Sequence, residues 1–177
     1  ADDPYLALLS AAIERQAALV AQWQLIGFIH GVMNTDNMSI AGETIDYGPC
    51  AFMDTYHPET VYSSIDHMGR YAYQNQPPIA HWNLAGLAQA LLPLLSENED
   101  EAVEKATAAI NTFPECFKAS YTAGLGRKLG LSTVDVGDEV LGSDLLERMA
   151  RNKADFTLTF RYLSALSQTQ NDADNHV

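Results

Sequence analysis

A short polar segment in the first third of the chain carries residue types that bind divalent cations. Asp36 and Asn37 stand side by side, and Asp46 follows nine residues after Asn37. Carboxylate and amide oxygens are the hard ligands that Mg²⁺ prefers, and one or two of them suffice when phosphate groups supply others. The pattern therefore predicts that this Asp-Asn pair and the second Asp can hold a divalent cation against a nucleoside triphosphate.

The residues between these side chains predict how they are brought together. Residues 38–40 and 44–45 are strand-like, and Gly42 between them has the backbone freedom that a tight turn needs. Asn37 and Asp46 would then lie at the two open ends of one short hairpin. The simpler interpretation, that this polar segment only forms a turn, would be preferred if no further motif accompanied it.

A histidine upstream extends the pattern. His30 precedes Asn37 by seven residues, and Asp46 begins an Asp-Tyr-Gly triplet. Protein kinases have a His, a metal-binding Asn and an Asp-Phe-Gly triplet in this order, so the arrangement resembles the lower lobe of a kinase. Such a His supports the backbone near the metal-binding Asp. The kinase catalytic Asp is replaced by Val32, which cannot accept a proton, and the nearby carboxylate is that of Asp36.

Taken together, the segments HGVMNTDNMS (residues 30–39) and TIDYGP (residues 44–49) resemble the selenoprotein O family, also called the YdiU family. The resemblance runs from about residue 20 to about residue 165, and it includes these downstream segments: residues 66–73, 75–77, 82–84, 155–157 and 160–161. It implies a kinase-like fold that transfers AMP from ATP to Ser, Thr or Tyr hydroxyls of protein substrates.

The same resemblance implies roles for the polar residues. Asp36 would be the catalytic proton acceptor, and Asn37 and Asp46 would bind Mg²⁺ or Mn²⁺, with Asp46 also lying against the phosphates of ATP. Members of this family are longer and carry an upper lobe that supplies the rest of the ATP site. We therefore expect a C-terminal-lobe fragment that is inactive alone and whose partners are the missing N-lobe and hydroxyl-bearing proteins.

Outside this segment the apolar spacing predicts a mainly α chain. We expect a protein-kinase-like C-lobe core at residues 1–95, which includes the short β-hairpin with the metal-binding loop, and a C-terminal helical extension at residues 96–177. Asp3 and Gly27 should bound the first helix, and Ser96 with Glu99 should form a capping box. The expected helices cover about residues 4–26, 78–95, 96–110, 114–129, 138–150 and 155–166. The sequence Gly124-Leu125-Gly126 falls inside one of them and is a weak match to a phosphate-binding loop.

The charge composition of the chain narrows the classes of molecule that it could bind. The chain has 10 basic and 23 acidic residues, a net charge of −13, which disfavours binding to nucleic acids or to membrane surfaces. The start of the chain lacks the basic segment of a signal peptide, and Cys50 and Cys116 have no zinc-type spacing. We expect free thiols and a cytoplasmic location.

Other interpretations remain open at this stage. The chain could belong to a kinase-type phosphotransferase, or to a non-catalytic pseudokinase that serves as a helical interaction module. An apolar face left uncovered in a fragment could drive self-association. Arg70 is expected to pair with Asp54 or Asp66 and fix the long loop, and the following residues have no spacing typical of a zinc site: His57, Asp66, His67 and His81.

Overall fold

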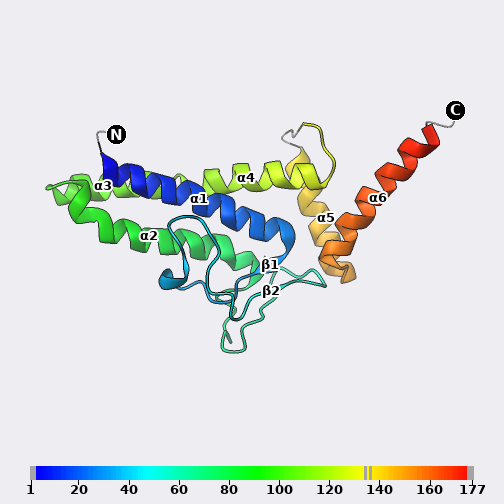
Figure 1. Cartoon of the computed structure of the whole chain (residues 1–177), viewed down its shortest axis with the longest axis horizontal. Coiled ribbons are helices and arrows are strands. Elements are labelled where there is room, and N and C mark those ends of the chain that lie inside the picture. Colours follow the sequence, from blue (N-terminus) through cyan, green and yellow to red (C-terminus); the bar gives the residue numbers. More distant parts are fainter. Residues whose placement is uncertain (1–2, 134, 136, 175–177) are drawn as a thin grey trace.

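The computed structural model describes residues 3–133, 135 and 137–174, and this part of the chain is mainly helical, as expected. Its helices are α1 (Pro4–Ile26), α2 (Gln76–Leu95), α3 (Glu99–Ile110), α4 (Phe113–Lys128), α5 (Asp138–Asn152) and α6 (Phe156–Asp174). In Figure 1, α1 and α2 run alongside one another, while α3 lies near the start of α1 and α4 lies further along toward α5. The loops between β1 and α2 gather on one side of these helices, and α6 extends away at one end.

Two short strands connect the helical bundle to the long loops. Strand β1 (Phe28–Ile29) directly follows α1 and pairs antiparallel with β2 (Ala51–Phe52). Two 3₁₀ turns, η1 (Thr35–Asn37) and η2 (Tyr73–Asn75), lie in the loops before α2. The polar segment singled out above therefore lies in the connection between β1 and β2.

Helix α1 begins and ends where the sequence predicts. The side chain of Asp3 accepts a hydrogen bond from the Leu6 backbone N–H (2.9 Å), which satisfies one of the free donors of the first turn. Gly27 ends the helix in the left-handed conformation (φ 70°), which glycine adopts without strain. Its buried face includes Leu9 and Ile13, both fully buried, so the predicted apolar stripe is confirmed.

The main core lies among α1, α2 and α3. Small side chains on α2 and α3 let these helices approach α1 closely, and Phe113 at the start of α4 closes the core. Trp82, which the sequence places in the apolar stripe of α2, is instead 59 % exposed. The small buried residues of these two helices are Ala80, Ala88, Ala102, Ala106 and Ala109.

The two glycines at residues 124 and 126 have a structural explanation. Both are buried within α4, and a side-chain carbon added at Gly124 would overlap Leu25 of α1. Gly142 of α5 similarly lies against Leu125, which an added carbon would overlap. These glycines allow close helix packing, and their position inside a helix is unlike that of a phosphate-binding loop.

A second core joins the loops to α5 and α6. Ile29 of β1 and Tyr73 of η2 pack with Phe156 and Phe160 at the start of α6. The backbone of the 53–56 segment is tied to the turn between α5 and α6, because Phe156 N–H donates to the Asp54 carbonyl (2.7 Å) and Tyr56 N–H donates to the Ala154 carbonyl (2.9 Å). The long loop after β2 is thus anchored at both ends.

Two local expectations differ from the structure. The N-cap of α3 is Asn98, whose side chain accepts from the Glu101 N–H (3.1 Å), so the capping box expected at Ser96 and Glu99 is wrong. Ser96 instead donates its hydroxyl hydrogen to the Glu101 carboxylate (3.0 Å). Helix α6 continues past its expected end at residue 166. Among the described helices, none combines the length and apolar content needed to cross a membrane.

Candidate functional site

The connection between β1 and β2 is a long loop that folds back on itself. Within residues 30–50, Met38 and Thr44 form a single antiparallel bridge. The turn between them is closed by the Gly42 N–H, which donates to the Ser39 carbonyl (3.0 Å). The predicted hairpin is therefore present, but only one pair of residues bridges its two arms.

The two expected metal ligands flank this bridge in the sequence. Asn37 directly precedes Met38, and Asp46 follows Thr44 by two residues, so both leave the bridge at its open end. The hydroxyl of Thr44 accepts a hydrogen bond from the Trp23 indole N–H (3.0 Å), which fixes the bridge to α1. The bridge shortens the separation between these two chain segments, and the convergence of the Asn37 and Asp46 side chains on one ion stays a prediction.

A chain of hydrogen bonds connects the two positions. The Asn37 side-chain amide donates to the Val32 carbonyl (3.0 Å), and the Val32 N–H makes a long contact with His30 Nδ1 (3.4 Å). The other ring nitrogen, Nε2, lies 2.7 Å from the Ile45 carbonyl, which belongs to the peptide joined to Asp46. Since the Val32 N–H points at Nδ1, the hydrogen of a neutral ring is on Nε2, which donates to Ile45.

His30 is held by its own set of contacts. Its side chain is fully buried, and its ring lies 5.4 Å from that of Trp23. Gln76, also fully buried at the start of α2, accepts from the His30 backbone N–H and donates to the Phe28 carbonyl (both 2.9 Å). The expectation that His30 supports the backbone near Asp46 is confirmed by these contacts.

The two aspartates of the site are held differently. Asp46 has a positive φ of 53°, a strained conformation for a residue with a side chain, and such strain is concentrated at functional sites. Asp36 lies in the 3₁₀ turn η1, next to Asn37, and both aspartate side chains are exposed. Val32, in the place of the kinase catalytic Asp, has both of its backbone groups engaged in the hydrogen bonds described above.

The donor atoms of Asn37 and Asp46 fit a magnesium ion. The amide nitrogen of Asn37 donates to the Val32 carbonyl, and its amide oxygen is the atom that could bind a metal ion. In the described part of the chain the Asp46 carboxylate has no ion-pair partner. Groups of three or more His, Cys, Asp or Glu that could hold a metal are absent from the described residues. A magnesium site at Asn37 and Asp46 therefore stays a prediction, in which water and phosphate oxygens would complete the coordination.

The remaining polar candidates have structural roles. Asp66 accepts hydrogen bonds from the backbone N–H groups of Arg70 (2.9 Å) and Tyr71 (2.8 Å) and so closes a turn. The expected ion pair of Arg70 with Asp54 or Asp66 is wrong among the described residues, because the guanidinium lies over the rings of Tyr71 (5.7 Å) and Trp82 (4.9 Å). His81 Nε2 lies 3.1 Å from the carbonyl of Ile110 at the end of α3.

Sequence reasoning missed three buried amides that hold the loop to the helices. Besides Gln76, Gln16 of α1 donates to the Ser39 carbonyl, and Asn83 of α2 donates to the Met33 carbonyl (2.9 Å). Gln16 is three residues after Ile13 on the buried face of α1. A polar residue at such a core position was the one available signal, because a buried amide needs a partner.

Comparison with known proteins places this geometry in context. A sequence model of the family described as "Protein adenylyltransferase SelO" matches residues 1–177. A protein of Methylorubrum extorquens (strain PA1), named protein nucleotidyltransferase YdiU, is 68 % identical over 163 residues, which cover 92 % of this chain. Proteins of the same name from Rhodopseudomonas palustris (strain BisB5) and Bradyrhizobium diazoefficiens are 65 % and 64 % identical, over 93 % and 90 % of this chain. The chain spans about a third (33 %) of the length of each of these curated relatives.

Proposed function

Because this chain belongs to the SelO family of protein adenylyltransferases, we propose that its central loop is the metal- and phosphate-binding part of an enzyme that transfers AMP from ATP to protein hydroxyl groups. The observation that supports this most is the hydrogen-bonded chain from Asn37 through Val32 and His30 to the peptide before Asp46. It connects two oxygen-bearing side chains and ends at a strained residue, which is an arrangement that packing alone does not require.

Each polar residue has a separate task in this proposal. The amide oxygen of Asn37 and the carboxylate of Asp46 would hold Mg²⁺ or Mn²⁺, which neutralises the phosphate charge when it is bound. Asp46 would also lie against the phosphates of a bound nucleotide. Asp36, exposed beside Asn37, accepts the proton of the attacking hydroxyl, and such general-base help contributes typically about 10²–10⁴ in rate.

Label transfer tests the roles of these residues in the protein at its full natural length. With radioactive phosphorus at the α position of ATP, Asp46→Ala should abolish labelling of protein substrates, because both charge neutralisation and alignment are lost. Asp36→Asn should slow it by about 10²–10⁴-fold. Glu43→Ala removes an exposed carboxylate from the same hairpin and should leave labelling unchanged. Retained labelling in Asp46→Ala would contradict the metal assignment.

The alternative phosphotransferase is distinguished by the same assay. A kinase-type enzyme would transfer label from the γ position, whereas an adenylyltransferase transfers it from the α position. The replacement of the kinase catalytic Asp by Val32 supports the second outcome. A non-catalytic pseudokinase would transfer neither label, and it would leave the strained backbone at Asp46 without a function.

We also propose that these 177 residues alone do not enclose a nucleotide. Large apolar side chains around the loop are exposed, among them Phe52 (62 %), Tyr47 (61 %) and Met68 (92 %). In the complete protein this face would meet the upper lobe that the family resemblance implies, and in isolation it would favour self-association. Titration calorimetry on the isolated chain should show weak ATP binding or none, and tight Mg²⁺-dependent binding would contradict the proposal.

A further inference from the structure

A short turn in the long loop before α2 carries an arginine that the proposed site does not use. The Asp66 carboxylate accepts hydrogen bonds from the backbone N–H groups of Arg70 (2.9 Å) and Tyr71 (2.8 Å). The Gly69 carbonyl of the same turn accepts from the Asn75 side chain (2.7 Å). Because these bonds hold the backbone of the turn, the side chains of Arg70 and Tyr71 start from fixed positions.

The same turn is attached to the loop that carries the expected proton acceptor. The Tyr71 hydroxyl donates to the side-chain oxygen of Asn34 (2.5 Å), which is exposed two residues before Asp36. The Asn34 carbonyl also accepts from the Asn37 N–H (3.0 Å) and so closes the 3₁₀ turn η1. Arg70, the neighbour of Tyr71 in the sequence, is therefore held close to η1.

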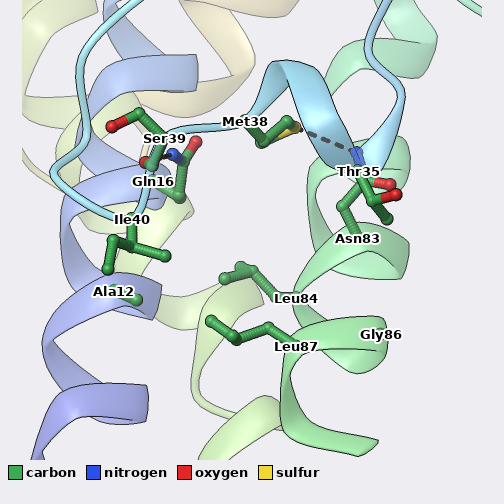
Figure 2. Close-up of a pocket in the computed structure, with 10 residues that line it drawn as sticks. All are labelled: Ala12, Gln16, Thr35, Met38, Ser39, Ile40, Asn83, Leu84, Gly86 and Leu87. Carbon is green, nitrogen blue, oxygen red and sulfur yellow. Dashed lines mark hydrogen bonds between the residues drawn. The ribbon is translucent and has the colours of Figure 1, made fainter. Parts of the chain in front are cut away.

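Helix α2 brings a second aromatic side chain to this place. Asn83 of α2 donates to the Met33 carbonyl, and its amide nitrogen lies 2.9 Å from the Met38 sulfur, so it holds the loop on both sides of η1. Figure 2 shows Asn83 beside Thr35, with its amide directed at Met38. Trp82, the residue before Asn83, is 59 % exposed, whereas tryptophans are mostly buried.

Arg70 lies over the rings of both aromatic residues and keeps its hydrogen-bond donors. Its guanidinium carbon is 4.9 Å from the ring centre of Trp82 and 5.7 Å from that of Tyr71. Such contacts attract the positive charge but do not use the N–H donors. Among the residues that the structure describes, no carboxylate pairs with this guanidinium, and the hydrogen bond that Arg70 donates comes from its backbone. An oriented guanidinium with unused donors matches a carboxylate, which accepts two parallel N–H bonds.

We propose that Arg70 and Trp82 form a docking surface for the protein that is modified, and that Arg70 pairs with an acidic side chain next to the acceptor hydroxyl. This inference rests on the function proposed above, in which Asp36 receives the hydroxyl proton. The nucleotide phosphates would lie at Asn37 and Asp46, so a second anion beside η1 would come from the other reactant. Trp, Tyr and Arg are the residue types most enriched where proteins bind one another, which favours a protein over a small anion. Because the chain has a net charge of −13, few other places on it would attract an acidic segment.

Matched acceptor peptides test this pairing with α-labelled ATP and the protein at its full natural length. Each peptide carries one Ser, Thr or Tyr, and a single position near that residue is Glu in one peptide and Gln in its partner. We expect at least one position at which kcat/KM for the Glu peptide exceeds that for the Gln peptide by about three- to tenfold. The difference should lie in KM for the peptide, because the pairing is made on binding.

Two substitutions of Arg70 and one control locate the preference. In Arg70→Gln the ratio of Glu-peptide to Gln-peptide labelling should fall to about one, since the charge is lost. In Arg70→Glu the ratio should fall below one, because two carboxylates then repel each other. Arg161→Gln removes an exposed arginine from α6 and should keep the ratio of the parent protein.

The outcomes separate this inference from the function on which it rests. Equal labelling of the two peptides by the parent protein, or a preference that persists in Arg70→Gln, would overturn the docking proposal. A loss of labelling in Arg70→Gln that is the same for both peptides would assign the arginine to the nucleotide or to folding, and would also overturn it. All of these results leave AMP transfer intact. Label in no peptide with any form of the protein would instead contradict the proposed function, and this inference with it.

Discussion

The ring of His30 carries the contact that couples the two halves of the loop, and replacing it tests the architecture of the site. His30→Phe keeps an aromatic ring of similar size beside Trp23, but it removes both ring nitrogens. The Ile45 carbonyl then loses its partner at 2.7 Å, and the Val32 N–H loses a weaker one at 3.4 Å. The peptide before Asp46 would no longer be fixed by a side chain from the other half of the loop.

The cost can be estimated from these contacts. Ile45 is itself exposed, and its hydrogen bond to the buried His30 ring is only partly buried. Losing this bond costs about 1–3 kcal/mol, and the 3.4 Å contact adds little. The left-handed backbone of Asp46 stores about 1–3 kcal/mol of strain, which the His30 contact helps to hold and which is partly released in the variant. We expect a net loss of about 1 kcal/mol in the free energy of unfolding. With a urea dependence of about 2 kcal/mol per M, the unfolding midpoint falls by about 0.5 M.

The conservative variant His30→Gln provides the control. Its amide N–H reaches about as far as the ring Nε2 and can still donate to the Ile45 carbonyl, so we expect it to recover about half of the lost stability. Urea unfolding followed by circular dichroism measures both variants. In the protein at its full natural length, label transfer from ATP should fall in His30→Phe and recover in part in His30→Gln. A phenylalanine variant as stable as the parent, or a glutamine variant no better than phenylalanine, would refute this account of the loop.

Helix packing and one buried amine allow two more tests. Gly124→Ala should lower the free energy of unfolding by about 1–3 kcal/mol, because the new methyl group overlaps Leu25. Gly86→Ala should raise it by up to about 1 kcal/mol in the same urea titration, because its methyl group meets its nearest neighbour at an ordinary 3.7 Å. Burial lowers the pKa of Lys128 from 10.5 to about 8, so above pH 8 the unfolded chain binds more protons than the folded one and stability should rise toward pH 10. Burial also raises the pKa of Tyr121 from 10.0 to about 12, so stability should fall again above pH 10, where the unfolded tyrosine loses its proton first. Thermal melts between pH 7 and 11 should lack the rise below pH 10 in Lys128→Met, and an unchanged rise would exclude this lysine as its source.

The sequence predicts best those features that are decided within a few neighbouring residues. Asp3 and Gly27 bound α1 as expected, because capping and the left-handed turn involve only the adjacent helix turn. The next cap was predicted two residues too early. Ser96 and Asn98 have the same capping chemistry, and the choice between them depends on which one reaches the N–H of Glu101 in the folded chain.

Contacts between distant residues explain most of what the sequence could not predict. Gln76 reaches Phe28 of strand β1 from 48 residues away, and Trp82 is exposed although it falls at an apolar position of α2. Neither a helical period nor a motif shows which face of α2 the long loop will cover. Arg70 illustrates the same limit, since nearby aspartates suggested an ion pair and the fold instead offered two aromatic rings.

The candidate site combines both kinds of feature. The order of His30, Asn37 and Asp46 predicts which residues act together, since their spacing follows a known arrangement. Their relative placement depends on Val32, whose backbone N–H and carbonyl link His30 to Asn37. Every residue except proline has both of these backbone groups, so the type of residue at position 32 does not reveal this role. Every member of this hydrogen-bonded chain lies between β1 and β2, so the link between the two expected metal ligands is built within one loop. The position of that loop is set from outside it, because side chains of α1 and α2 bond to its backbone.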